Sequence, residues 1–283
     1  MIDQAEVATI VAFLEGPTVD AEGAVYFTET RTNRILKLDT AGNLSVFREN
    51  SNASNGLIFD ADWRLIACEG NRANPRVTRT TIRDGRIEVL AHHGMGLALT
   101  APNDVSLDSQ GRIYFTDLPG GTVHRVDRNG AVVRILNRPD IQNPNGICIS
   151  ADDKTLYLVE ANQTENGARM IRAYDLRPDG TVTGMRVHYN FYPGRSADGI
   201  TIDSAGNLYA AAGLNRTRGT SETLDTKCGI HVISPQGKLL AFTAIPEDTL
   251  TNCCFGGPDL KTLYVTAGKT LYRIRTQVEG TRR

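Results

Sequence analysis

Short apolar segments rich in β-branched and aromatic residues recur along the whole chain, and polar turns separate them. In one stretch GRIYFTD, GTVHRVD and AVVRILN follow one another, with Gly, Asp and Asn at the breaks. This alternation is typical of β-strands joined by tight turns. No segment shows a sustained apolar period of about 3.6 residues, so we expect almost no helix. The pattern therefore predicts an all-β protein.

A longer unit repeats six times along the chain, and each copy has a polar start, an apolar strand, a turn and a second apolar strand. The copies begin at Glu15, Asn55, Asn103, Asn145, Asp198 and Asn252, so successive starts lie 40, 48, 42, 53 and 54 residues apart. An Asp five residues after the start fixes the register in four copies, at Asp20, Asp60, Asp108 and Asp203. Such spacings are close to the roughly 40–50 residues of a four-stranded propeller blade. We predict a single domain over residues 1–283, a six-bladed β-propeller with four-stranded antiparallel blades.

The two ends of the chain differ from the repeat. The sixth copy runs out after three strands, whereas Glu6–Phe13 is an apolar strand that belongs to no copy. We predict that this N-terminal strand completes the last blade and closes the ring, because closure removes the exposed edge of an incomplete sheet.

Charge and composition exclude several classes of function. The chain has 31 Lys+Arg against 32 Asp+Glu, so it offers no basic field for nucleic acid or an acidic membrane surface. We read no signal peptide at the start, and no stretch reaches the roughly 20 apolar residues of a membrane span. Five cysteines without paired C-x-x-C spacing favour buried free thiols over a disulfide framework or a zinc site. We interpret the adjacent Cys253 and Cys254 as core residues of a strand rather than as a redox-active pair. We expect a cytoplasmic protein that acts on a small molecule, as a monomer or small homo-oligomer.

The polar starts of the six copies form a candidate metal site. The innermost strand of each blade lines the channel of a propeller, so equivalent repeat positions form a ring at one height. Here the ring has two carboxylates, Glu15 and Asp198, and four carboxamides. Converging side-chain oxygens suit a hard cation such as Ca²⁺, Mg²⁺ or Mn²⁺. Without a cation, the two carboxylates would face each other and one would tend to stay protonated.

Ordinary turn chemistry is the competing explanation for these polar starts, since Asn-Gly and Asp-Gly are common turn dipeptides. Turns alone would explain Asn55-Gly56 and Asn145-Gly146. They would not explain Glu15, a poor turn residue, or Asn103 and Asn252, which are not followed by Gly. The set favours a metal ring, while Asn55 and Asn252 taken singly fit either explanation.

The repeat motifs resemble those of the gluconolactonase/regucalcin family, also called the senescence-marker-protein and luciferin-regenerating-enzyme-like family. The matching segments span all six copies: LEGPTVDAEGAVYFTE, SNGLIFDADWRLIACEGN, APNDVSLDSQGRIYFTD, NPNGICISADDKTLYLVE, SADGITIDSAGNLYAA and TNCCFGGPDLKTLYVTA. The resemblance implies one divalent cation held by a Glu, two Asn and an Asp, which match Glu15, Asn103, Asn145 and Asp198. Ca²⁺ is the favoured ion, with Mg²⁺, Mn²⁺ and Zn²⁺ as alternatives. The chain has Ala101 where regucalcin has an Arg that contacts substrate.

The resemblance also implies hydrolysis of a sugar-type lactone or a similar small lactone. We expect the cation to polarise the lactone carbonyl, stabilise the oxyanion and hold the attacking water. Asp198 is the candidate general base, with hydroxide on the cation as the alternative. Loops 69–76, 160–169 and 213–228 are expected to cap the channel and to select the substrate. Candidate substrate contacts are Asn55, Asn252, Arg72 and Asn162, and the loops also carry Asn215, Arg216 and Arg218.

Two other functions fit the same sequence. A phosphotriesterase-like or other ester hydrolase would use the same metal on a different bond. A non-enzymatic propeller that binds calcium or protein is the second alternative, because fold alone does not define function. Against the latter, the WD signature of scaffold propellers does not repeat, since Asp62-Trp63 occurs in no repeated place.

Overall fold

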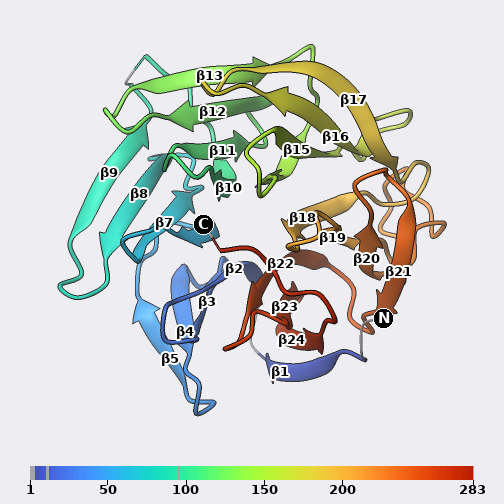
Figure 1. Cartoon of the computed structure of the whole chain (residues 1–283), viewed down its shortest axis with the longest axis horizontal. Helices are drawn as coiled ribbons and strands as arrows, with labels where there is room; N and C mark the ends of the chain where they lie inside the picture. The colour runs from blue at the N-terminus through green and yellow to red at the C-terminus, as the bar shows by residue number, and fades with distance from the viewer. Residues whose placement is uncertain (1–3, 11–12, 95, 283) are drawn as a thin grey trace.

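The computed structural model describes residues 4–10, 13–94 and 96–282 of the chain. Within these ranges 24 strands form six four-stranded antiparallel sheets, and no residue lies in a helix. The sheets stand around a central axis as the blades of a propeller (Figure 1). The predicted six-bladed propeller is therefore confirmed.

The first three blades each use four consecutive strands, ordered from the axis outward. Blade one consists of β2 (Leu14–Val19), β3 (Val25–Glu29), β4 (Arg34–Leu38) and β5 (Leu44–Arg48). Blade two consists of β6 (Ser54–Phe59), β7 (Arg64–Glu69), β8 (Arg76–Thr81) and β9 (Ile87–His92). Blade three consists of β10 (Pro102–Leu107), β11 (Ile113–Asp117), β12 (Thr122–Val126) and β13 (Val132–Asn137).

Two of the remaining blades follow the same order, and the last takes its outer strand from the N-terminus. Blade four consists of β14 (Pro144–Ile149), β15 (Thr155–Ala161), β16 (Arg169–Leu176) and β17 (Val182–Asn190). Blade five consists of β18 (Ala197–Ile202), β19 (Leu208–Ala212), β20 (Gly229–Ile233) and β21 (Leu239–Ala244). Blade six consists of β22 (Leu250–Gly256), β23 (Thr262–Ala267), β24 (Thr270–Arg275) and β1 (Glu6–Ile10).

The ring closes where the two ends of the chain meet. Strand β1 pairs antiparallel with β24, with Glu6 opposite Arg273 and Ile10 opposite Thr270. Closure by the N-terminal strand is therefore confirmed. The predicted strand ran from Glu6 to Phe13, whereas β1 ends at Ile10 and residues 11 and 12 lie outside the described part of the chain.

The recurrent Asp of the repeat builds the turn between the two innermost strands of its blade. In blade one, Asp20 Oδ1 accepts hydrogen bonds from the backbone N–H groups of Glu22 and Ala24, at 3.0 and 2.9 Å. The equivalent turns bond in the same way to Asp60, Asp108 and Asp203. A carboxylate that accepts from the backbone two residues on stabilises such a turn. The residue that fixed the sequence register is thus a structural residue.

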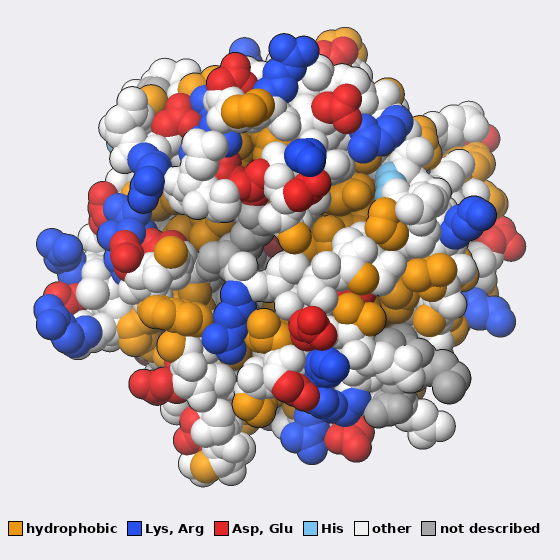
Figure 2. Space-filling model, in the orientation of Figure 1, with side chains coloured by type: hydrophobic (Ala, Val, Ile, Leu, Met, Phe, Trp, Pro, Cys, Tyr) orange, Lys and Arg blue, Asp and Glu red, His pale blue; other side chains and the backbone are white. Residues whose placement is uncertain are grey.

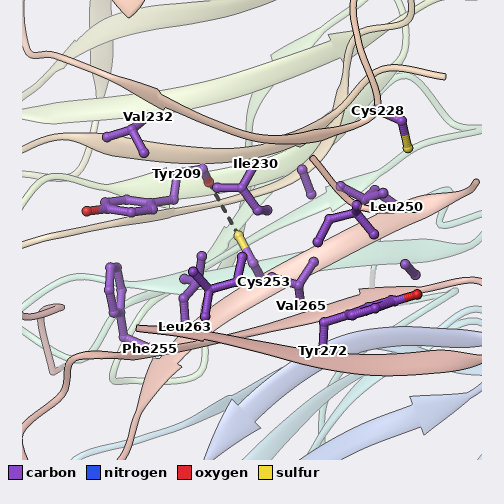
Figure 3. Close-up of a cluster of buried hydrophobic side chains, with 14 residues drawn as sticks. Tyr209, Cys228, Ile230, Val232, Leu250, Cys253, Phe255, Leu263, Val265 and Tyr272 are labelled. Atoms are coloured by element: carbon purple, nitrogen blue, oxygen red, sulfur yellow. Dashed lines mark hydrogen bonds between the residues drawn. The ribbon is translucent and has the colours of Figure 1, made fainter. Parts of the chain in front are cut away.

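Apolar side chains fill the spaces between neighbouring blades. Figure 3 shows one such cluster, in which Tyr209 and Ile230 of blade five pack against Cys253 and Phe255 of blade six. The rings of Tyr209 and Phe255 meet edge to face, with 4.9 Å between their centroids. Because close-packed interiors deform little, this packing holds the inner strands at fixed positions around the axis.

None of the five cysteines, all of which the structure describes, forms a disulfide, and four are buried while Cys254 is partly exposed. Burial raises the pKa of Cys253 well above its usual range and also raises the pKa of Cys254. A raised pKa disfavours the thiolate that redox chemistry needs. The structure therefore supports the interpretation of these two residues as core residues.

The surface carries acidic and basic side chains that are intermixed. Figure 2 shows this on the face viewed in Figure 1, where neither sign gathers into a continuous field. In the described ranges there is also no helix long and apolar enough to span a membrane.

Candidate functional site

The six polar repeat starts lie on the inner strands and follow one another around the axis. A Cβ added to Gly146 of blade four would lie 2.6 Å from the carbonyl oxygen of Asp198 in blade five. A Cβ added to Gly199 would lie 2.0 Å from Oδ1 of Asn252 in blade six. The turn explanation for Asn145-Gly146 is wrong, because both residues lie inside β14. Glycine is needed there because the next inner strand leaves no room for a side chain.

The two carboxylates of this ring lie in a shared, desolvated environment. Burial raises the pKa of Glu15 well above its usual range, and the negative charges of Asp198 and Asp104 raise it further. The pKa of Asp198 is also raised by burial, although Arg195 and a hydrogen bond from Asn145 act in the opposite direction. Like charges in a desolvated site disfavour simultaneous ionisation. A cation between the two carboxylates would relieve this repulsion.

Two of the four amide side chains of the ring, Asn55 and Asn145, carry an unpaired oxygen. Among the described residues, neither Oδ1 of Asn145 nor Oδ1 of Asn55 has a hydrogen-bond partner, and both atoms are buried. A buried acceptor without a hydrogen-bond partner destabilises the folded protein, so we expect a ligand, an ion or water to bind these atoms. Asn103, the predicted ligand from blade three, lies near the start of β10 and is partly exposed.

The donor chemistry of the ring fits a hard divalent cation. Carboxylate and carboxamide oxygens are the side-chain ligands that Ca²⁺ and Mg²⁺ prefer. In the described ranges no group of three or more His, Cys, Asp or Glu is placed to hold a metal. A metal here would therefore depend on amide oxygens, such as Oδ1 of Asn145, together with Glu15 and Asp198.

The sequence analysis missed Asp104, which lies fully inside the channel. Asn252 donates to both of its carboxylate oxygens, at 2.8 and 2.9 Å. Burial raises the pKa of Asp104 to about 8, and the charge of Asp198 adds to this, while the hydrogen bond from Asn252 lowers it. The repeat distinguishes Asp104 in the sequence, because four of the other copies have glycine at this position: Gly16, Gly56, Gly146 and Gly199.

Two hollows lie along the inner strands. The mouth cavity, of about 350 Å³, is lined by Asn145, Arg195, Asp198, Glu222 and Asn162, among others. It lies on the side where the inner strands begin. The inner channel, of about 150 Å³, is lined by later residues of all six inner strands and by the C-terminal segment.

The C-terminal segment covers the inner channel on the side away from the mouth cavity. Arg282 lines this channel, and its guanidinium lies over the ring of Trp63, 5.9 Å from the centroid. Gly280 and Thr281 are held by backbone hydrogen bonds to Leu260 and Ile202. Figure 1 shows the C-terminal end of the chain near the centre of the propeller, beside the inner strands.

The four predicted substrate contacts lie in different parts of the site. Asn162 lines the mouth cavity, and its Nδ2 donates to Gln142 Oε1 at 2.7 Å. Asn55 belongs to the ring, and Asn252 lines the inner channel, where it binds Asp104. Arg72 is exposed and is not among the residues that line either hollow.

Arg195 is the second residue of the site that sequence reasoning missed. Its Nη2 donates to Oδ2 of Asp198 at 2.7 Å, and the residue is 6% exposed. A buried, charge-assisted pair of this kind holds the carboxylate in one orientation. Its spacing of three residues before Asp198 was visible in the sequence, but whether the two side chains meet depends on the fold.

Comparisons by sequence and by structure both match this chain to gluconolactonases. A model of the SMP-30/Gluconolactonase/LRE-like region matches residues 13–269. A gluconolactonase from Zymomonas mobilis is 26% identical over 311 aligned residues, which cover 97% of this chain and 81% of that protein. A pentonolactonase from Haloferax volcanii is 30% identical over 170 residues, but these cover 58% of this chain and 52% of that protein. The solved structure of a gluconolactonase from Xanthomonas campestris superposes with a TM-score of 0.80 at 26% identity, covering 96% of this chain and 89% of that one.

Proposed function

The chain belongs to the SMP-30/gluconolactonase/LRE-like family, and from this premise we propose that it is a metal-dependent lactonase that opens a sugar-type lactone in the mouth cavity. The observation that carries the proposal is the pair of desolvated carboxylates, Glu15 and Asp198, beside the unpaired Oδ1 of Asn145. The names of the gluconolactonase and pentonolactonase relatives support the reaction type.

One divalent cation, with Ca²⁺ favoured, would be held by Glu15, Asn103, Asn145 and Asp198. The two carboxylates would balance its charge, and the amide oxygens would complete the oxygen ligands it needs. When bound there, the cation supplies Lewis-acid polarisation of the lactone carbonyl. Its binding would also offset the burial and the repulsion from Asp198 and Asp104 that together raise the pKa of Glu15.

Asp198 is the proposed general base. Arg195 engages its Oδ2 at 2.7 Å, which leaves Oδ1 to take a proton from the attacking water. The water oxygen then bonds to the carbonyl carbon. The ring C–O bond breaks, and the ring oxygen leaves as a hydroxyl after it receives the proton that Asp198 took from the water. The reaction thus consumes one water and yields one hydroxy acid.

Groups of the mouth cavity would hold the substrate during this reaction. Asn162 and Glu222 line the cavity and offer amide and carboxylate oxygens to sugar hydroxyls. A cavity of about 350 Å³ has the size of a monosaccharide lactone site rather than that of a polymer-binding groove.

Metal analysis and a substrate panel test the proposal. The purified protein should hydrolyse an aldonolactone, lose that activity in a chelator and regain it when Ca²⁺ is added back. Aliphatic lactones and fluorophosphates in the same panel distinguish the lactonase from an ester or phosphotriester hydrolase. Full turnover in excess chelator with no bound metal would defeat the metal mechanism. Calcium binding without turnover of any ester would favour the non-enzymatic alternative.

The role of Asp198 needs its own variant. Asp198→Asn keeps an oxygen ligand of similar size but removes the base. The proposal expects turnover to fall by about 100-fold or more, in line with general-base contributions. Near-wild-type turnover with retained metal would overturn the assignment of Asp198 as the base.

A further inference from the structure

Arg195 has more hydrogen-bonding capacity than the protein uses. Its Nη2 donates to Asp198, but its Nη1 is buried and has no hydrogen-bond partner among the described residues. The residue is 6% exposed and lines the mouth cavity. A guanidinium has five N–H donors in a fixed plane, and a buried donor without an acceptor is costly. The cavity therefore presents an unsatisfied cationic donor beside the proposed catalytic base.

A second guanidinium lies close to the first. Arg218 comes from the loop between β19 and β20, and its Nη2 donates to Thr249 Oγ1 at 2.7 Å. Arg218 is exposed and is not among the residues that line the mouth cavity. Partial desolvation lowers its pKa, and the positive charge of the nearby Arg195 lowers it further. Among the described residues, no carboxylate lies within 4.0 Å of the nitrogens of Arg218. Of these two neighbouring cations, only Arg195 therefore pairs directly with a carboxylate of the described residues, that of Asp198.

The mouth cavity, which Arg195 lines, also offers hydrogen-bond acceptors. Glu222 is 4% exposed, lines the cavity and accepts a hydrogen bond from Thr220 Oγ1 at 2.9 Å. Asn162 and Thr164 also line the cavity. Hydroxyl groups of a ligand suit such acceptors, whereas an anionic group suits the guanidinium pair. A ligand that satisfies both would carry several hydroxyls and one negative charge.

We propose that the mouth cavity selects an anionic sugar lactone, whose second acid group binds between Arg195 and Arg218. This inference rests on the proposed lactonase function and narrows its substrate class. The acid group is a carboxylate, as in a lactone of an aldaric or uronic acid, or a phosphate ester. Arginine binds both groups through parallel N–H donors. A neutral aldonolactone would leave Nη1 of Arg195 without an ionic partner.

Steady-state kinetics on three lactones tests the inference with the holoenzyme. The probes are neutral D-gluconolactone, D-glucarolactone with a free carboxylate, and the phosphate ester of D-gluconolactone. At least one anionic lactone should have a KM lower than that of the neutral lactone by about tenfold or more, the range of a charge-assisted hydrogen bond. The anionic probe with the lower KM identifies the acid group. Equal or weaker affinity for both anionic lactones, with efficient turnover of the neutral one, would overturn the inference and leave the lactonase function intact.

A variant separates this binding role from the support of Asp198. Arg218→Gln leaves the Arg195–Asp198 pair in place and should reduce the preference for the anionic lactone by about tenfold. Arg216→Gln is the matched control, because Arg216 is exposed in the same loop and lies 3.6 Å from Asp248. Increasing ionic strength should raise the KM of the anionic substrate more than that of the neutral one. An unchanged preference in Arg218→Gln would contradict the proposed role.

Calorimetry with the ring-opened acids tests the anion site even if the protein hydrolyses no lactone. D-glucarate, with two carboxylates, should bind at least tenfold more tightly than D-gluconate, with one, and Arg218→Gln should remove the difference. That result would support the anion site while the proposed lactonase function fails. Equal affinities of the two acids would overturn the anion site itself.

Discussion

Asn252 in blade six and Asp104 in blade three meet across the propeller axis, with the Nδ2 of Asn252 2.8 and 2.9 Å from the two oxygens of Asp104. These blades lie on opposite sides of the ring (Figure 1). The bond crosses the channel beside the ring residues, where the charge of Asp104 also raises the pKa of Glu15. The channel thus holds three carboxylates, and amide side chains donate to two of them, Asn252 to Asp104 and Asn145 to Asp198.

The first prediction concerns this third carboxylate. Asp104→Asn should stabilise the metal-free protein near pH 7 by roughly 1–3 kcal/mol, because it removes a carboxyl that must take up a proton on burial, with a pKa of about 8, yet keeps an acceptor for Asn252. Chemical denaturation in a chelator measures the change. Asp84→Asn, at an exposed carboxylate, is the control and should have little effect. A large loss of stability in Asp104→Asn would show that the charge itself is required.

Glu15→Gln should affect the metal-free and metal-loaded proteins in opposite directions. Without a cation, the loss of a desolvated charge beside Asp198 should raise the melting temperature. With Ca²⁺, the loss of a carboxylate ligand should weaken binding by about 100-fold or more and reduce the stabilisation that the ion provides. Melting curves at several Ca²⁺ concentrations measure both effects. Glu22→Gln, at an exposed position, is the matched control. Unaltered Ca²⁺ affinity in Glu15→Gln would remove Glu15 from the metal site.

Gly146→Ala should disturb the ring through backbone crowding. The added Cβ would lie 2.6 Å from the carbonyl oxygen of Asp198, so blade five has to shift. Overpacking of this kind costs roughly 1–3 kcal/mol. The variant should also bind the cation less tightly, which calorimetry measures. Gly42→Ala is the control, since nothing lies within 4 Å of its added Cβ and only backbone strain remains. Equal cation affinity in both variants would contradict the role of crowding.

Deletion of Met1–Val11 should open the ring at blade six. Removal of β1 exposes the edge of β24, and an unpaired edge strand promotes both unfolding and aggregation. We expect a sharply lower melting temperature and concentration-dependent light scattering. Arg273→Ala is a useful comparison, because it removes only the exposed ion pair with Glu6 at 3.0 Å, worth about 0–1 kcal/mol. A truncated protein with unchanged stability would contradict closure by this strand.

The acid stability of the protein should depend on His124. Its ring stacks on Phe115, and burial lowers its pKa from 6.5 to about 4. A histidine with a lowered folded-state pKa contributes stability that is present above pH 6.5 and is lost as the pH falls towards 4. The loss amounts to about 3 kcal/mol over this range. His124→Gln should flatten this part of the stability profile in urea titrations, whereas His92→Gln, at an exposed position, should not. An unchanged profile in His124→Gln would assign the acid sensitivity to other groups.

The sequence by itself determined the architecture, because the signal is repeated. Six polar starts, a turn-building Asp such as Asp20 and an unassigned N-terminal strand sufficed to predict six blades and their closure. Because the unit repeats, equivalent positions must lie at one height around the axis, so the repeat predicts positions in space as well as local structure. The ring with Glu15 and Asp198 follows from the same reasoning.

Only the tertiary structure decided which side chains meet. Asp104 and Asn252 are 148 residues apart, and their bond depends on which blades are opposite and how deep each side chain reaches. Likewise, Arg72 and Arg218 are both loop arginines and neither lines a hollow, yet Arg218 lies near enough to Arg195 for the charge of Arg195 to lower its pKa. The pattern of strands fixes the height of a residue in the propeller. Side-chain partners and desolvation depend on packing between distant segments, which no local pattern encodes.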